Sequence, residues 1–385
     1  MRQDTPLRRI LSSRAAKLKL PVSGGFELTP RCNLSCKMCY IHQNGNACAA
    51  QELSAERWLD MGRQAADAGA LFLLLTGGEP FLRPDLYEIY LGLTKMGLSV
   101  SINSNGTLID DRAIEWLRQS PPAQINISLY GVSRETYARL CGVPEAFDRV
   151  QTAIDALLRA GIQVGINATM SPINGADMDG IVAFAKERGL RVRPVHYLFP
   201  PVRREAVGCT APIRYDAEEA GRRTALAQSM TEEMERMQRY AWAQPDADSF
   251  EPADDCVRAE GAPLGCLAGS SQFWISWDGK LMPCGMLDEP AMRPFETGFA
   301  PAWRDLVAET AKFRLPAVCG ECTLRSACPA CAAINRAETG RVDERPDYLC
   351  RLTKEYVRTL QALFPKNEGT SEAIACGVQR VFCPN

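Results

Sequence analysis

Three cysteines in one short segment constrain this chain more than any other feature of its sequence. Cys32, Cys36 and Cys39 are separated by three and then two residues, directly after an apolar stretch typical of a β-strand. Three thiolates on a tight loop can ligate three irons of a cubane cluster and leave the fourth iron open for a small chelating molecule. A structural zinc site normally closes all four positions, and this spacing matches zinc motifs poorly. The loop therefore predicts an open [4Fe–4S] cluster, with a zinc knuckle completed by His42 as the alternative.

Composition narrows the choice of metal and of partner. The 385 residues include sixteen cysteines and only two histidines, so sulfur ligands dominate. Clustered cysteines in a reducing compartment ligate metals more often than they form disulfides. The first residues lack the apolar core of a secretory signal, and no apolar run is long enough to span a membrane. The net charge is −2 and no long basic run occurs, so we expect a cytoplasmic protein with no nucleic-acid or membrane partner.

Short apolar segments alternate with amphipathic helical patterns between Phe26 and Tyr197. This alternation indicates βαβ units and a parallel sheet covered by helices, with ligands at the carboxyl ends of the strands. Periodicity alone does not decide between a partial α/β barrel and an open sheet. The expected strands are 26–29, 71–75, 99–103, 124–129, 163–169 and 191–197, and the expected helices are 55–68, 86–96, 110–119, 147–160 and 178–188.

The second half of the chain is organised differently. Residues 215–242 form one charged helical pattern, an acidic linker with two prolines follows, and a last helix is expected at 351–363. Apolar runs on both sides of Asp278-Gly279 predict a β-hairpin that carries Cys284. We therefore divide the chain into an N-terminal segment (1–24), an α/β domain (25–205), a helical bridge and linker (206–255), a small cysteine-rich α+β domain (256–355) and a C-terminal segment (356–385).

The cysteine loop, its place after the first strand and the six βα units resemble the radical S-adenosylmethionine (SAM) superfamily. That resemblance implies a partial (β/α)6 barrel and an iron chelated by the amino and carboxylate groups of SAM. It also implies reductive cleavage of SAM to a 5′-deoxyadenosyl radical. The chain departs from the family pattern at Met38, where an aromatic residue is usual, although a methionine sulfur can also pack against adenine.

Segments at the predicted strand ends resemble the SAM-binding segments of this superfamily. Gly77, Gly78, Glu79 and Pro80 follow the second strand, where glycines permit close approach and the carboxylate can accept a hydrogen bond from an ammonium group. Ser104 and Asn105 follow the third strand and resemble a ribose-contacting segment, with a simple Asn-Gly turn as the alternative. By resemblance, Ser128 and Arg149 would hold the methionine carboxylate, unless Arg149 is an ordinary surface arginine.

The cysteines of the second half resemble the SPASM domain, which holds two auxiliary [4Fe–4S] clusters. Here two residues separate Cys328 from Cys331, where the family usually has three, and a pair of zinc sites is the competing interpretation. By resemblance one cluster is bound by Cys319, Cys322, Cys328 and Cys350, and the other by Cys266, Cys284 and Cys331, with Cys256 as the candidate fourth ligand. If Cys256 does not ligate the cluster of Cys266, Cys284 and Cys331, one iron of that cluster would be open to a substrate thiol. The resemblance thus implies three clusters in all.

SPASM-bearing radical enzymes mostly modify peptides or protein side chains, so we expect a peptide or protein substrate. Ribosomal peptide maturation, by thioether or carbon–carbon crosslinks, is the leading hypothesis. The sulfatase-maturing branch has a basic aspartate where this chain has Gly285, and peptide-derived cofactor synthesis is the third branch. An electron donor such as flavodoxin or ferredoxin is implied. Because few residues precede the first strand, a leader on the substrate would be recognised either by a separate leader-binding protein or by the mouth of the barrel. A non-catalytic iron–sulfur or zinc protein is the alternative from a different class.

Overall fold

The structure is a computed structural model that describes residues 6–41, 51–200, 213–247, 261 and 263–366. Its centre is one sheet of eight strands in the order β6-β5-β4-β3-β2-β1-β7-β8. Neighbouring strands are parallel, except for the antiparallel pair β7 and β8. The strands are β1 (Ser23–Glu27), β2 (Phe72–Thr76), β3 (Ser99–Ser104), β4 (Gln124–Ser128), β5 (Val164–Thr169), β6 (Val192–Val195), β7 (Gln272–Ile275) and β8 (Leu281–Met282).

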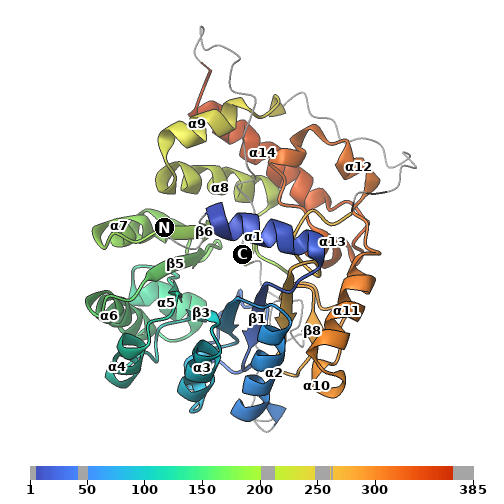
Figure 1. The fold of residues 1–385 in the computed structure, drawn as a ribbon. Helices are drawn as coiled ribbons and strands as arrows, with labels where there is room; N and C mark the ends of the chain where they lie inside the picture. The colour runs from blue at the N-terminus through green and yellow to red at the C-terminus, as the bar shows by residue number, and fades with distance from the viewer. Residues whose placement is uncertain (1–5, 42–50, 201–212, 248–260, 262, 367–385) are drawn as a thin grey trace.

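Helices cover the outer face of the sheet between successive strands, as Figure 1 shows. They are α2 (Ala55–Asp67), α3 (Leu86–Lys95), α4 (Asp111–Gln119), α5 (Arg134–Cys141), α6 (Ala146–Arg159) and α7 (Met178–Glu187). The predicted α/β class is confirmed, and the six predicted strands and five predicted helices lie within three residues of their expected bounds. Helix α5 was not predicted. It has eight residues, begins after the side-chain cap Ser133 and ends at Gly142, whose φ is +76°.

Alternation along the middle strands separates an apolar outer face from a polar inner face. Ile102, Ile125 and Ile166 are buried in the core shared with the surrounding helices. Their neighbours in sequence, including Asn103 and Asn126, point to the opposite face, because successive side chains of a strand alternate. The helices therefore pack on isoleucines, and the interior of the partial barrel is lined by polar groups.

The hairpin β7–β8 is part of the barrel sheet, since β7 pairs in parallel with β1. Two consecutive glycines of β1 make this possible. A Cβ atom on Gly24 would lie 2.1 Å from the ring of Phe273, and one on Gly25 would lie 2.2 Å from the ring of Trp274. Phe273 also packs on Phe299 of α11 (Phe299–Thr310), with ring centroids 5.0 Å apart. The sequence predicted the hairpin but not its place beside the first strand.

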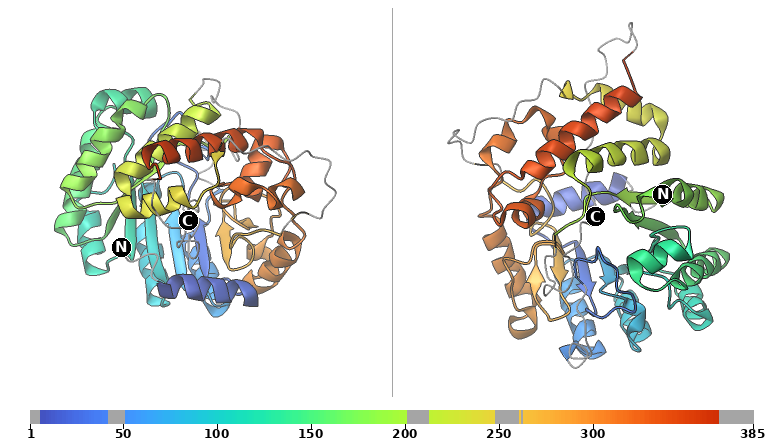
Figure 2. Two further views of the ribbon diagram at one scale, coloured as in Figure 1. Left: turned by 90° about the horizontal axis from the view of Figure 1, so that it is seen from above. Right: turned by 180° about the vertical axis from the view of Figure 1, so that it is seen from behind.

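The remaining helices close the open side of the sheet. In both figures α8 (Ala217–Thr231) and α14 (Asp347–Leu363) lie side by side, in agreement with their dense contacts (Figures 1 and 2). The smaller elements here are α9 (Met234–Trp242), α12 (Ala317–Gly320), the 3-10 helix η5 (Thr323–Ser326) and α13 (Ala332–Thr339), and α10 (Pro294–Thr297) precedes α11. At the amino ends of the strands lies α1 (Pro6–Leu18), where the Trp303 indole donates to the Lys19 carbonyl at 2.7 Å. No described helix is both long and apolar enough to cross a membrane.

The single helix predicted over 215–242 is wrong, because the chain breaks between α8 and α9. Glu232 and Glu233 both have extended backbone angles there. The break turns Met237 and Tyr240 onto α14, where both are buried in a cluster with Tyr356. Burial of these two side chains favours the bend over a straight helix.

Candidate active site

The three thiols of the cysteine loop lie close together just beyond the carboxyl end of β1. Cys36 is buried, and Cys32 and Cys39 are partly buried. Burial is the main reason that the pKa of the Cys32 thiol rises to about 12, and the nearby Glu79, Cys36 and Cys39 contribute to this rise by repelling a thiolate. Metal ligation reverses this preference, because coordinating thiols lose their protons. Three clustered thiols in an apolar setting therefore fit an iron–sulfur cluster.

The cysteine loop is fastened to the end of helix α5. The backbone N–H of Ser35 donates to the carbonyl of Cys141 at 3.1 Å, and that of Lys37 donates to the carbonyl of Leu140 at 2.9 Å. Met38, the residue that departs from the family pattern, is 7% exposed and belongs to the barrel core. These contacts fix the backbone that carries the thiols before any cluster is present.

An ion network holds the chain where β1 leads into the loop. The guanidinium of Arg31 grips both carboxylate oxygens of Glu52, at 2.7 and 2.9 Å. The buried Arg83 lies 3.6 Å from the same carboxylate and donates to the Leu28 carbonyl at 2.9 Å. Charge-assisted and bidentate contacts are the strongest and most geometrically specific hydrogen bonds, so Arg31 is held directly before Cys32.

The glycines after β2 allow two backbone segments to touch. The N–H of Gly78 donates to the Thr29 carbonyl at 2.7 Å, and the N–H of Glu79 donates to the Arg31 carbonyl at 2.8 Å. A Cβ atom on Gly77 would lie 2.4 Å from the Thr29 carbonyl oxygen, and one on Gly78 would lie 2.1 Å from that of Arg31. The turn Gly77–Pro80 is therefore docked on the segment that leads into the cysteines.

Glu79 is fully buried, and the chain itself occupies its carboxylate. One oxygen accepts from the backbone N–H of Phe81 at 3.1 Å and from the hydroxyl of Ser104 at 2.8 Å. The other accepts from the backbone N–H of Asn105 at 2.6 Å. Burial raises the pKa of Glu79 to about 7, although these three donors favour the charged form. The carboxylate thus braces the loop after β3 against the turn after β2, a role that the sequence did not suggest.

The buried carboxylate predicts a specific pH dependence of stability. The pKa of Glu79 in the folded chain lies above its ordinary value of 4.5, so the folded chain binds more protons between the two values. The protonated Glu79 side chain therefore makes its full contribution to the free energy of unfolding below about pH 4.5, and this contribution is lost as the pH rises through about 7. Glu79→Gln cannot titrate. Relative to wild type, its free energy of unfolding should therefore rise by about 3 kcal/mol over this window.

Chemical denaturation of the metal-free chain at several pH values measures this difference. The control is Glu56→Gln, which alters an exposed glutamate in the first turn of α2. A difference between Glu79→Gln and wild type that stays constant across the window would contradict a raised pKa.

The other SAM contacts predicted from the sequence lie at the same end of the barrel, but they are not all in contact with one another. The side chains of Ser104 and Asn105 are both engaged by other residues of the chain. Ser128 is partly exposed at the end of β4 and shares a hydrogen bond with the Tyr130 hydroxyl. Arg149 is exposed in the first turn of α6, and no hydrogen bond links it to Ser128 in the described structure.

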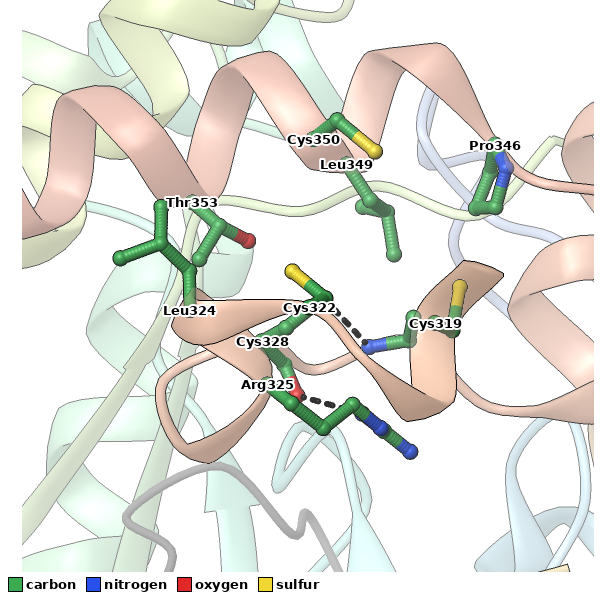
Figure 3. A pocket seen from close by; sticks show the side chains of 10 residues that line it. Cys319, Cys322, Leu324, Arg325, Cys328, Pro346, Leu349, Cys350 and Thr353 are labelled. Carbon is green, nitrogen blue, oxygen red and sulfur yellow. Dashed lines mark hydrogen bonds between the residues drawn. The ribbon is translucent and has the colours of Figure 1, made fainter. Parts of the chain in front are cut away.

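Four cysteines of the second half line one pocket between α12, η5 and α14 (Figure 3). Cys319 belongs to α12, Cys322 and Cys328 lie just before and after η5, and Cys350 faces them from α14. Burial and the neighbouring thiols raise the pKa of Cys350 to about 12. The hydroxyl of Thr353 also lines the pocket and is buried with no hydrogen-bond partner in the described structure. Four thiols and an orphaned donor fit a cluster, whose sulfur atoms accept hydrogen bonds.

A second group of thiols lies near the hairpin. Burial is the main reason that the pKa of Cys284 rises to about 12, and Cys331 and Cys266 add to the shift. The three thiols are therefore neighbours, although they are far apart in sequence. Cys256, the candidate fourth ligand, lies outside the described residues. Nowhere in the described ranges do three histidine, cysteine, aspartate or glutamate side chains converge as the ligands of one metal ion would. A [4Fe–4S] cluster instead takes each thiol on a separate iron.

A polar wall lines the barrel interior, and it was not predicted from the sequence. Strand register places Asn103 beside Asn126, Ser128 beside Asn167, and Asn167 beside Arg193. The Asn126 amide donates to the Asn103 side-chain oxygen at 2.8 Å. On β3, β4 and β5 the residues of this face are Ser101, Asn103, Gln124, Asn126, Ser128, Gly165, Asn167 and Thr169, all uncharged. The period-two alternation of polar residues in these strands was the signal that could have revealed the wall.

A carboxylate and an indole also face the barrel interior, from the neighbouring strands β1 and β7. Glu27, at the end of β1, is 2% exposed, and the Trp274 indole N–H donates to it at 3.1 Å. A Cβ atom on Gly285 would lie 2.9 Å from the same indole. The indole therefore fills the space beside Cys284 where a longer residue at position 285 would project.

Comparison with known proteins agrees with this architecture. A family model described as the Radical SAM superfamily matches residues 26–185. The AdoMet-dependent heme synthase of Methanosarcina barkeri is 30% identical over 335 residues, which cover 84% of this chain and 94% of that protein.

Two solved structures share the fold over almost the whole chain. Streptococcus suis SuiB bound to its precursor peptide SuiA has a TM-score of 0.63 and 21% identity, covering 90% of this chain and 82% of that one. The protein anSMEcpe with bound AdoMet and Kp18Cys peptide has a TM-score of 0.65 and 16% identity, covering 89% and 98%. At this identity the likeness concerns the fold.

Proposed function

This chain belongs to the radical SAM superfamily, and from that premise we propose that it modifies a peptide or protein with the help of three [4Fe–4S] clusters. It is an enzyme whose cofactors are SAM and an iron–sulfur cluster. When bound, these cofactors supply a 5′-deoxyadenosyl radical that abstracts a hydrogen atom from the substrate. The protein's own task is to hold the cofactors, orient the substrate and exclude water.

In this proposal the cysteine loop holds the cluster that binds SAM. Cys32, Cys36 and Cys39 each ligate one iron. The backbone of Gly77–Pro80 faces SAM from the end of β2, and the Ser128 hydroxyl faces it from the end of β4. Glu79 supports this site indirectly and does not contact SAM, because its carboxylate oxygens accept hydrogen bonds from Phe81, Ser104 and Asn105. Arg149, exposed in the first turn of α6, is the proposed partner of the SAM carboxylate.

The auxiliary clusters are proposed at the two groups of cysteines in the second half. The shared pocket supports one four-thiol set, Cys319, Cys322, Cys328 and Cys350. The influence of Cys266 and Cys331 on the pKa of Cys284 supports the other set. Because Cys328 and Cys331 are close in sequence, electrons can pass between the two clusters and leave towards a carrier such as flavodoxin or ferredoxin.

The uncharged inner wall is the observation that supports a peptide substrate. Carboxamide groups such as those of Asn103, Asn126 and Asn167 offer both donors and acceptors, which match the N–H and C=O groups of a peptide backbone. A substrate rich in carboxylates would need cations, and Arg193 is the charged residue on the neighbouring β6 face. SuiB and anSMEcpe, which share the fold, were both solved with peptides bound.

Within the peptide-modifying class, the surroundings of Gly285 disfavour sulfatase-type maturation. An aspartate there would collide with the Trp274 indole, since even a Cβ atom would come within 2.9 Å of it. Ribosomal peptide maturation, by a thioether or a carbon–carbon crosslink, is therefore the proposed reaction.

A tetrapyrrole substrate is the second candidate, because the heme synthase of M. barkeri aligns over 94% of its length. One experiment separates the two. Reconstituted enzyme, SAM and a strong reductant are incubated anaerobically with a peptide encoded by a short reading frame beside the gene, or with an iron porphyrin that bears propionate groups. We expect the peptide to lose two hydrogens per crosslink, as measured by mass spectrometry. An altered porphyrin beside an unchanged peptide would contradict the proposal.

A variant of the inner wall links the result to the site. Asn126→Leu removes the amide that bonds to Asn103 and leaves the cysteine loop untouched. We expect peptide modification to fall at least about tenfold, the effect of losing one well-placed hydrogen bond, while SAM cleavage without substrate continues. Equal modification by Asn126→Leu and wild type would contradict a peptide held on this wall.

A further inference from the structure

The loop after β3 is locked onto the cysteine loop by three side chains. The Asn33 amide donates to the Thr107 hydroxyl at 2.8 Å. The Thr107 hydroxyl in turn donates to the side-chain oxygen of Asn105 at 2.6 Å, and the Asn105 amide donates to the side-chain oxygen of Asn33 at 2.9 Å. The three groups form a closed ring, in which each donates and each accepts.

The ring fixes the orientation of the Asn105 side chain. Its oxygen also accepts from the backbone N–H of Thr107 at 2.9 Å, so two donors identify that atom as the oxygen and not the nitrogen. The backbone N–H of Asn105 is held by Glu79 at 2.6 Å, and the residue is 8% exposed. The Asn105 amide nitrogen must therefore face the cysteine loop, where it lies 3.6 Å from Sγ of Cys32.

From this geometry we propose that Asn105 is a positioning residue that donates a hydrogen bond to the Cys32 sulfur and raises the reduction potential of the first cluster. The inference rests on the proposed function, because it needs a cluster at Cys32. The same sulfur accepts from the backbone N–H of Leu34 at 3.4 Å. Donors to ligating sulfur stabilise the electron-rich reduced cluster more than the oxidised one, which moves the potential upwards.

This role differs from the ribose contact that the sequence suggested for Asn105. Both polar atoms of its side chain are already engaged, the oxygen by Thr107 and the nitrogen by Asn33 and Cys32. Contact with a ribose would require the ring to open. Glu79 acts on the same sulfur indirectly, since it holds the backbone from which the amide reaches Cys32.

The test is Asn105→Asp in the full, reconstituted chain. The aspartate keeps the oxygen that Thr107 needs, but it cannot donate to Cys32 and adds negative charge. The matched control is Asn103→Asp, the same change two residues earlier, where the side chain bonds to Asn126 on the inner wall. Redox titration monitored by electron paramagnetic resonance follows the signal that changes when SAM is added. The auxiliary clusters serve as internal references.

We expect Asn105→Asp to lower the ratio of reduced to oxidised first cluster at least about tenfold at a fixed potential, which is a shift of about 59 mV for one electron. Asn103→Asp and the auxiliary signals should not move. Loss of iron confined to the SAM-sensitive cluster would also support the role in positioning. If the aspartate prevents folding, Asn105→Ala gives the same comparison without added charge. An unchanged midpoint with full iron overturns the inference alone, whereas a wild-type chain without a SAM-sensitive signal overturns the proposed function as well.

Discussion

Alanine at Cys32, Cys36 and Cys39 together is expected to remove about a third of the bound iron and all cleavage of SAM. Three cubanes hold about twelve irons, and this change leaves the ligands of two. Cleavage disappears because, in the proposal, SAM binds the open iron of the cluster that these three thiols hold. Iron assay after anaerobic reconstitution and chromatography of 5′-deoxyadenosine measure the two effects.

Cys141→Ala is the matched control for this triple variant. Cys141 is fully buried beside the loop, but it contributes its backbone carbonyl, which alanine retains. We expect full iron and full cleavage in this variant. Stoichiometric zinc and no visible chromophore in the wild-type chain would end the cluster assignment, and persistent cleavage in the triple variant would show that the loop is not its site.

Replacing Cys319 and Cys322 by alanine is expected to abolish the product while SAM cleavage continues. These thiols supply half of the ligands in the pocket beneath α14, and two remaining thiols do not hold a cubane. About four irons should be lost. The cysteine loop follows β1 and keeps its own backbone contacts with α5, which do not involve these two thiols.

The measurement for this second variant pairs iron content with mass spectrometry of the peptide. Deoxyadenosine should still form, because radical generation depends on the first cluster. The product should be absent, because the substrate radical has lost its path for the departing electron. A full yield of crosslinked peptide from the variant would show that this cluster is dispensable, and unchanged iron would remove it from the proposal.

The parallel α/β sheet could be predicted from the sequence because its signals are local, whereas the partial barrel was implied by the family resemblance. Alternating apolar strands and amphipathic helices fix the sheet, and an open C-x3-C-x2-C loop identifies the chemistry. The break between α8 and α9 could not be predicted, since Glu232 and Glu233 suit a helix and only the burial of Met237 and Tyr240 on α14 bends the chain.

The site was harder to predict where one residue acts through another. Glu79 stands in a motif that suggests a ligand contact, yet three donors from two loops occupy its carboxylate. Asn105 stands in an Asn-Gly sequence typical of a turn, and only the fold brings it to Cys32. Contacts across more than seventy positions leave no periodic trace in a single sequence.

The pairing of β7 with β1 has a consequence for how the two halves of this protein can exist. An unpaired first strand would present an open row of N–H and C=O groups, a template for association with other chains. Gly24 and Gly25 have no side chains to shield that edge, and the aromatic rings of Phe273 and Trp274 lie over them instead. The later segment is therefore the chain's own protection against edge-to-edge aggregation. A barrel domain without this segment would leave the hydrogen-bonding groups along one side of β1 without their strand partners.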